Sequence, residues 1–155
     1  MTEMRAALFV AAYALLGAWP ADPFDQLKSL AGEWEADLPG FGKLTESIRL
    51  VSNGKAIEET LGSPADNEVS IYTRDNNSIL LTHFCAMTPD GHVARLETGA
   101  LSGGQDRLTF VFIGSAAPHM RLVVMTFTDQ DHFSEKWTKI ENGKDTVFDL
   151  TFVRR

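Results

Sequence analysis

The sequence SILLTHFCA, residues Ser78–Ala86, has the composition and length of a β-strand. Turn-forming residues bound it on both sides, with DNN at Asp75–Asn77 before it and PDG at Pro89–Gly91 after it. Successive side chains of a strand point to opposite faces of the sheet, so one face is expected to carry Ile79, Leu81, His83 and Cys85. An imidazole and a thiol then face the same way, and this face is the first candidate for a functional site.

The rest of the chain repeats this pattern of strand-like segments closed by clusters of Gly, Asn, Asp or Pro. One short helix is predicted at about Pro23–Ala31, where Asp22 can cap the N-terminus and Gly32 ends the segment. The predicted strands are Glu33–Leu38, Lys43–Val51, Lys55–Leu61, Glu68–Arg74, Ser78–Ala86, His92–Leu101, Arg107–Ile113, His119–Asp129, His132–Ile140 and Lys144–Arg154. The pattern predicts an all-β fold, an antiparallel up-and-down β-barrel of about ten strands with one short N-terminal helix.

The charge balance argues against nucleic-acid partners. The chain has 155 residues, with 21 acidic and 14 basic side chains and a formal net charge of -7. This charge repels nucleic acid and anionic lipid at long range. The length is that of one domain, and no internal repeat or linker is visible.

The N-terminus differs from the rest of the chain. After Arg5, residues Ala6–Ala18 form an apolar run that is too short to span a bilayer and has the length of a secretory signal core. We expect residues 1–21 to be a signal peptide and residues 22–155 to form the barrel domain, which would be periplasmic or secreted and free of the membrane after signal removal. The alternative is a cytoplasmic protein with an uncleaved N-terminal helix. Cys85 is the only cysteine, so no intrachain disulfide can form.

Turn positions predict how the strands pair. A two-residue turn at Asn142–Gly143 would place Trp137 opposite Phe148, Glu135 opposite Leu150 and Phe133 opposite Phe152. A turn at Asn53–Gly54 would place Leu50 opposite Ile57, Ile48 beside Glu59 and Glu46 beside Leu61. A turn at Gln130–Asp131 would pair Val124 with Trp137 and Thr126 with Glu135. A turn at Asp75–Asn76 would pair Tyr72 with Ile79, Ser70 with Leu81, and Glu68 with His83.

These registers predict an interior with both apolar and polar walls. The expected apolar lining residues are Ile48, Leu50, Leu81, Met120, Val124, Phe133, Trp137 and Phe148. The expected polar lining residues are Glu46, Glu59, Glu68, Tyr72, His83, Cys85 and Glu135. The pattern alone does not settle which face of Glu68–Arg74 and Ser78–Ala86 is inside, because the opposite face, with Val69, Ile71, Leu80, Thr82 and Phe84, is at least as apolar. Buried carboxyl groups are costly unless they are paired, so this many inward ones imply water or a cationic partner.

Several motifs resemble those of known proteins. Gly32-Glu33-Trp34, a Gly-x-Trp directly after a short helix, and the hairpins that follow resemble the calycin superfamily of lipocalins, fatty-acid-binding proteins and nitrobindins. A bacterial calycin-like family of unknown function is similar over nearly all of the chain after residue 30, in Glu59-Thr60, Tyr72 with the Asp75 turn, Leu81–Ala86, His119-Met120, Asp131–Phe133 and Trp137. The resemblance implies a barrel with Tyr72, His83 and Cys85 facing its interior, and it implies no activity. The glycine-rich first strand of nitrobindins is replaced here by Glu33–Asp37, so their haem is not carried over.

The sequence favours the binding of a small hydrophobic or amphipathic molecule inside the barrel, with no cofactor. The expected binding residues are Glu59, Glu68, Tyr72, His83, Cys85, Met120, Glu135 and Trp137. One alternative is a haem or transition-metal protein that uses His83 and Cys85 with Glu68, because imidazole, thiolate and carboxylate all bind such metals. The other alternative is a structural or interaction protein with a filled barrel.

An enzymatic reading has weaker support. Side chains two apart on one strand lie side by side, so Cys85 and His83 cannot align well as nucleophile and base. No glycine-rich phosphate loop or serine elbow is present. A glutamate and a histidine in the cavity remain an alternative pair for acid–base chemistry.

Overall fold

The computed structural model describes residues 19–63, 66–85, 92–101, 106–114, 120–141 and 143–155. The core of the predicted signal peptide lies outside this range, and so do Ala86, His119 and Asn142. The signal peptide and the compartment therefore stay predictions. Among the described residues, no helix is both long enough and apolar enough to cross a membrane.

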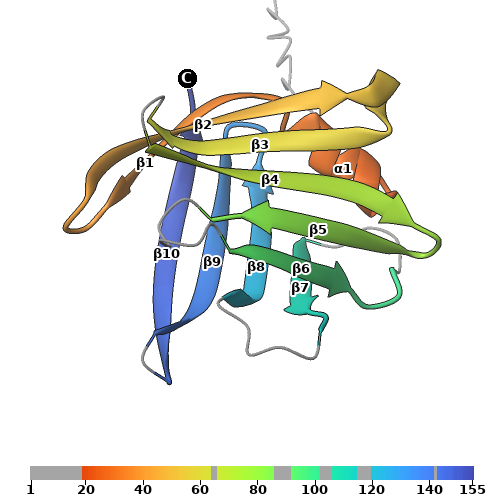
Figure 1. Cartoon of the computed structure of the whole chain (residues 1–155). Helices are drawn as coiled ribbons and strands as arrows, with labels where there is room; N and C mark the ends of the chain where they lie inside the picture. The colour runs from red at the N-terminus through yellow and green to blue at the C-terminus, as the bar shows by residue number, and fades with distance from the viewer. Residues whose placement is uncertain (1–18, 64–65, 86–91, 102–105, 115–119, 142) are drawn as a thin grey trace, which may run out of the picture.

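The described strands form a closed antiparallel barrel, as the sequence predicts (Figure 1). Each strand pairs with its neighbours along the chain, and β1 closes the barrel against β10 through the pairs Trp34 with Arg154 and Glu35 with Val153. The strands are β1 (Gly32–Leu38), β2 (Gly42–Val51), β3 (Ala56–Ser63), β4 (Asp66–Asp75), β5 (Ser78–Phe84), β6 (Val93–Thr98), β7 (Arg107–Phe112), β8 (Met120–Asp129), β9 (His132–Glu141) and β10 (Lys144–Arg154). Strands β2 to β5 cross steeply over β8 to β10, as the twist of a small barrel requires.

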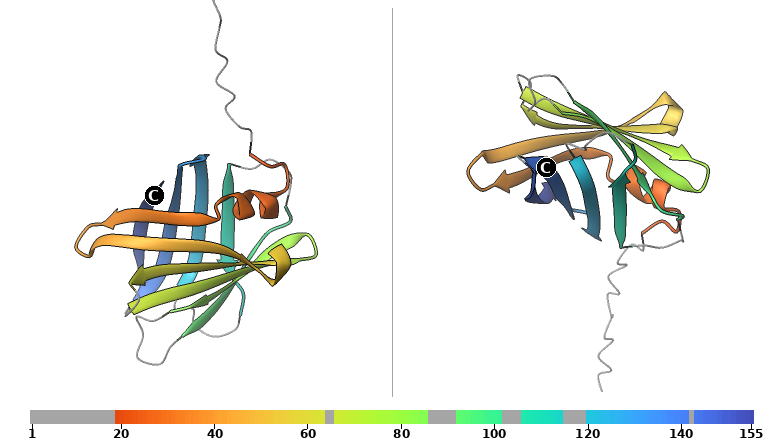
Figure 2. Two further views of the ribbon diagram at one scale, coloured as in Figure 1. Left: turned by 90° about the horizontal axis from the view of Figure 1, so that it is seen from above. Right: turned by 60° about the horizontal axis from the view of Figure 1, so that its bottom comes forward.

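The helix α1 (Pro23–Ser29) packs at one end of the barrel, and the β1–β2 hairpin extends at the other end (Figure 2). The Asp22 carboxylate caps the helix by accepting hydrogen bonds from the backbone N–H groups of Phe24 and Asp25. Phe24, Leu27 and Leu30 are buried in the core. The prediction of this helix is confirmed, although it ends at Ser29 instead of Ala31.

Two of the predicted registers are confirmed. Strands β9 and β10 pair Trp137 with Phe148, Glu135 with Leu150 and Phe133 with Phe152. Strands β2 and β3 pair Leu50 with Ile57, Ile48 with Glu59 and Glu46 with Leu61, although a 3₁₀ turn, η1 (Ser52–Gly54), replaces the expected two-residue turn. Glu46, Glu59 and Glu135 consequently point into the barrel.

The predicted β8–β9 register is wrong by one residue. Trp137 pairs with Val123 and Glu135 with Met125, so neither Val124 nor Thr126 takes the predicted place. A β-bulge causes the difference, because the pairs Asp129–His132 and Phe127–Phe133 leave Thr128 as an extra residue in β8. Val123 is therefore buried in the core, and Val124 is only half-buried.

The predicted β4–β5 register is wrong by two residues. Tyr72 pairs with Leu81 and Ser70 with His83, because the turn lies at Asn76–Asn77 and Asp75 still pairs with Ser78. A shift of two residues leaves every side chain on its predicted face, since strand side chains alternate with a period of two. Tyr72, His83 and Cys85 are accordingly buried.

The interior is filled with aromatic side chains at the end that α1 covers. Phe133 stacks on Phe152 with ring centroids 4.7 Å apart, and its edge meets Trp34 at 4.7 Å. All three residues are fully buried. Leu50, an expected lining residue, lies towards this end of β2 and is 47 % exposed, so that expectation is wrong. This half of the interior is therefore filled with side chains, and the opposite half is not filled in the same way.

Candidate functional site

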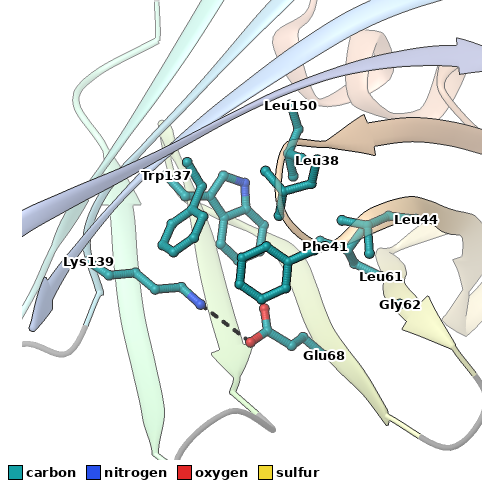
Figure 3. A pocket seen from close by; sticks show the side chains of 10 residues that line it. Leu38, Phe41, Leu44, Leu61, Gly62, Glu68, Trp137, Lys139 and Leu150 are labelled. Atoms are coloured by element: carbon teal, nitrogen blue, oxygen red, sulfur yellow. Dashed lines mark hydrogen bonds and ion pairs between the residues drawn. The ribbon is translucent and has the colours of Figure 1, made fainter.

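A cavity of about 160 Å³ lies at the barrel end distal to α1, and we call it the distal cavity (Figure 3). Strand ends meet there because the strands are antiparallel: β1 and β3 finish at this end, where β2, β4 and β10 begin. Its wall is mainly aliphatic and aromatic, and it consists of Leu38, Phe41, Leu44, Leu61, Gly62, Glu68, Trp137, Lys139, Phe148 and Leu150. Among the described residues of this wall, Glu68 and Lys139 are the charged ones.

A buried ion pair joins the two charged residues of the distal cavity. Lys139 Nζ lies 3.4 Å from Glu68 Oε1, and the two side chains are 5 % and 11 % exposed. The ammonium also lies 5.4 Å from the ring centroid of Phe148 and 5.8 Å from that of Trp137. Aromatic faces attract a cation, so these rings help to hold the ammonium at the cavity wall.

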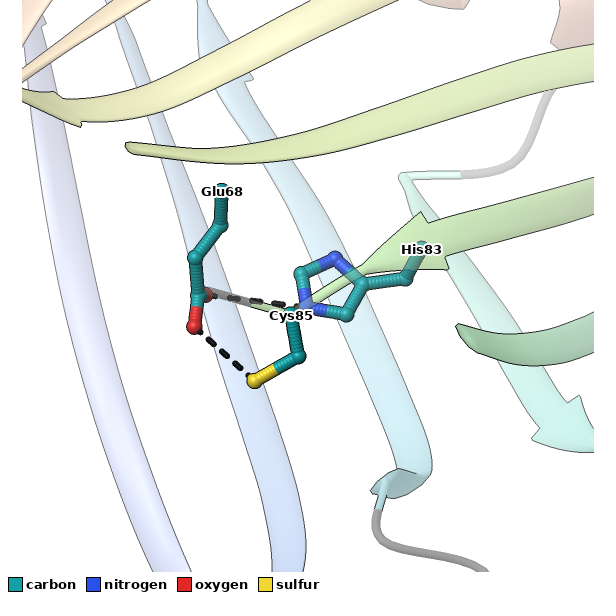
Figure 4. A group of neighbouring side chains, drawn as sticks. All are labelled: Glu68, His83 and Cys85. Carbon is teal, nitrogen blue, oxygen red and sulfur yellow. Dashed lines mark hydrogen bonds and ion pairs between the residues drawn. The ribbon is translucent and has the colours of Figure 1, made fainter. Parts of the chain in front are cut away.

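Glu68 also contacts the histidine and the cysteine of the SILLTHFCA segment (Figure 4). The Cys85 thiol donates a hydrogen bond to Glu68 Oε1 at 3.2 Å, and His83 Nε2 lies 3.6 Å from Glu68 Oε2. On the other side of the imidazole, Nδ1 lies 3.1 Å from the Ser70 hydroxyl oxygen. These contacts tie the imidazole and the thiol into a network that reaches Lys139 through Glu68.

The donor atoms of Glu68, His83 and Cys85 lie within 4.8 Å of one another, and their types suit a transition metal. Lys139 already supplies a positive charge to Glu68, however, and the imidazole meets the Trp137 ring edge-on at a centroid distance of 4.8 Å. Haem iron at His83 would have to displace Glu68 or Ser70 from a ring nitrogen. The arrangement fits a hydrogen-bonded network better than a haem ligand.

A second group of side chains, the carboxyl cluster of Glu46, Glu59 and Glu135, lies behind the cavity wall. The Tyr72 hydroxyl donates to Glu59 Oε2 at 2.5 Å, and the Trp137 indole N–H donates to Glu135 Oε2 at 2.7 Å. Trp137 thus separates the cluster from the distal cavity, since it also lines that cavity.

Burial raises the pKa of each carboxyl group in this cluster. Desolvation raises the pKa of Glu59 from its ordinary 4.5 to about 7, against the opposing effect of hydrogen bonds from Tyr72 and Ser70. Burial and the neighbouring carboxyl groups also raise the pKa of Glu46 and Glu135 well above the usual range. The cluster therefore favours protons or another positive charge between its members.

The eight binding residues expected from the sequence are all buried, but they fall into two groups. Glu68 and Trp137 line the distal cavity. His83 and Cys85 contact Glu68, and Glu59 and Glu135 belong to the carboxyl cluster, where Tyr72 donates to Glu59. Met120 is buried and pairs with Lys139 across β8 and β9.

Lys139 is the main residue that the sequence reasoning missed. It is 4 % exposed, and it follows the inward positions Phe133, Glu135 and Trp137 of β9 at the same spacing of two. Continuing that alternation by one step would have identified it. Leu38, Phe41 and Leu44 were also missed, because they line the cavity from the β1–β2 hairpin, and their role depends on where this hairpin packs.

The described residues form a closed ten-stranded antiparallel barrel with one helix, which is compatible with a calycin-like architecture. No family model matches the chain, and a search of curated proteins finds no significant relative.

Proposed function

We propose that this protein binds a small hydrophobic or amphipathic molecule in the distal cavity. The observation that carries the proposal is an apolar cavity with a buried ion pair, Lys139 with Glu68, on its wall. Ligand sites typically combine apolar walls with a few convergent polar groups, and they occur at the ends of β-barrels. The calycin-like character of the Gly-x-Trp segment and of the hairpins supports the same kind of function.

The size of the cavity and its polar wall restrict the ligand. At about 160 Å³ it is smaller than the ~300–1,000 Å³ of sites for drug-sized molecules, which favours a short chain or a single small ring system. Leu38, Leu44 and Leu61 supply an apolar wall for that body. Lys139 and Glu68 would bind a charged or polar end of the ligand. The Lys139 ammonium can pair with a negative group, and the Glu68 carboxylate can pair with a positive one.

Filling the cavity should abolish binding. Leu44 is half-buried and lines the cavity, so Leu44→Trp would place an indole ring where the ligand lies. Leu50→Trp is the matched control, because Leu50 lies on the same strand towards the opposite end. Calorimetric titration with octanoate and with octylamine measures the effect. We expect at least one of them to bind the wild type at one per chain, Leu44→Trp to weaken binding at least tenfold, and Leu50→Trp to leave it unchanged. Equal binding by Leu44→Trp, or no binding of either probe to the wild type, would contradict the proposal.

A further inference from the structure

The carboxyl cluster joins two neighbouring strands, β2 and β3, to a third strand, β9, that lies further around the barrel. Glu46 comes from β2, Glu59 from β3 and Glu135 from β9, and β10 and β1 lie between β9 and β2 in the sheet. The three side chains are 0 %, 1 % and 0 % exposed. One oxygen of each carboxyl group lies within 4.8 Å of an oxygen of the other two.

Hydrogen bonding leaves part of this cluster unsatisfied. Tyr72 and Trp137 each occupy one oxygen, of Glu59 and Glu135 respectively. Within the described part of the chain, both oxygens of Glu46 and Oε1 of Glu135 are buried with no hydrogen-bond partner. Across the same residues, no ion pair includes Glu46, Glu59 or Glu135. Buried carboxylates without a cation are strongly destabilising, so the cluster must either hold protons or take up a positive charge from elsewhere.

We propose that Glu46, Glu59 and Glu135 bind one divalent metal ion of the oxygen-preferring class, such as Ca²⁺ or Mn²⁺. Three atoms within 4.8 Å of one another share a central point no more than about 2.8 Å from each, and Ca²⁺–oxygen distances are ~2.3–2.6 Å. A contraction of a few tenths of an ångström would therefore bring these three oxygens to coordination distance, and the second carboxylate oxygens or water would supply the other ligands of an ion that takes ~6–8 oxygens. Carboxylates are hard ligands that suit Ca²⁺, Mn²⁺ and Mg²⁺, and Mg²⁺ fits less well because it keeps several waters.

The position of the cluster distinguishes it from the distal cavity and from the Glu68 network. An organic ammonium group would also match the distances between the carboxyl groups, but its carbon chain would need space beside them. The distal cavity does not supply that space, because Glu68 and Trp137 line it and no member of the cluster does. The Glu68 network has its own cation in Lys139 and offers an imidazole and a thiol, which suit softer metals. An ion bound by the cluster would link β2 and β3 to β9 across the interior of the barrel.

The test is a titration of the full chain with metal alone. Protein dialysed against EDTA and then freed of chelator is titrated with Mn²⁺ at pH 7.5, with free Mn²⁺ followed by electron paramagnetic resonance, and with Ca²⁺ by calorimetry. We expect one ion per wild-type chain, with affinity reduced at least tenfold in Glu46→Gln and in Glu135→Gln. Glu58→Gln is the matched control, because Glu58 precedes Glu59 on β3 and faces outward towards Arg49, and it should bind as the wild type does. Glu68→Gln tests whether the ion lies at the Glu68 network instead.

Thermal unfolding in EDTA verifies that each variant folds. Glutamine keeps the shape of glutamate and removes a buried charge, so Glu46→Gln should unfold at or above the wild-type temperature without metal. Added metal should stabilise the wild type more than it stabilises Glu46→Gln. The proposal is overturned if neither ion binds the wild type below millimolar concentration, or if folded Glu46→Gln binds as tightly as the wild type. It is also overturned if Glu68→Gln loses as much affinity, because the ion would then lie at the Glu68 network.

Discussion

Replacing Lys139 by methionine is expected to lower the free energy of unfolding by about 3 kcal/mol, because it leaves the Glu68 carboxylate buried without its cation. Methionine keeps most of the apolar length of lysine, so little packing is lost against Trp137 and Phe148. Urea denaturation at pH 7 measures the change. The effect is largely the penalty of an uncompensated charge and exceeds the net contribution of the ion pair itself.

Two controls separate this penalty from other effects of the substitution. The double variant Glu68→Gln with Lys139→Met removes both charges and should recover most of the lost stability. Lys136→Met should change stability little, because Lys136 and Asp149 form an ion pair on the surface with both side chains more than half exposed. A loss below about 1 kcal/mol for Lys139→Met would show that Glu68 does not depend on this ammonium.

The metal-free protein is expected to lose stability as the pH rises from about 5 to 9. The pKa of Glu59 is about 7 in the folded protein and has its ordinary value of 4.5 in the unfolded chain. Below pH 4.5 both states hold the proton, so the stability from this group is fully present there. As the pH rises through 7, the unfolded chain has already released its proton and the folded protein must do so at a cost. The loss from Glu59 alone levels off at about 3 kcal/mol.

The raised pKa of Glu46 and Glu135 should extend this loss to higher pH. Urea denaturation in EDTA at several pH values measures it, and Glu46→Gln should flatten the dependence and raise the stability at pH 8. Glu58→Gln is the matched control, because Glu58 is next to Glu59 on β3 and its side chain faces outward towards Arg49. A stability that rises between pH 5 and 9, or an unchanged slope in Glu46→Gln, would contradict the assignment of these carboxyl groups as a mutually destabilising cluster.

The barrel and most of its inward positions could be predicted from the sequence because local turn chemistry sets strand register. The short turn after Glu141 fixed the pairing of Trp137 with Phe148, and the structure has that pairing. The β8–β9 pairing could not be predicted in the same way. Thr128 is an ordinary strand residue with no signal for a bulge, yet its insertion shifts the partner of Trp137 from Val124 to Val123.

The turn between β4 and β5 shows which register errors affect the site. Three consecutive turn-forming residues, Asp75, Asn76 and Asn77, leave the position of the turn ambiguous. Asn76 adopts a positive φ of 50°, which asparagine tolerates better than most residues. The resulting error of two residues did not move Tyr72 or His83 to the outer face, so the predicted interior survived it.

The place of the distal cavity could not be predicted from strand alternation alone. Alternation places Lys139, Glu68 and Trp137 on inward faces, but the same is true of Phe133 and Phe152, which fill the other half of the barrel. The end that α1 covers decides which half is filled, and this is a tertiary property. The β1–β2 hairpin that carries Phe41 then supplies part of the wall.

Native mass spectrometry of the untreated full-length chain tests the binding proposal most directly. We expect the wild type to carry, or to take up from octanoate or octylamine, one organic molecule that denaturation releases, and we expect Leu44→Trp to carry none. A wild-type protein that neither retains nor takes up an organic molecule, or a Leu44→Trp variant that retains it equally well, would contradict the assignment of the distal cavity as a binding site.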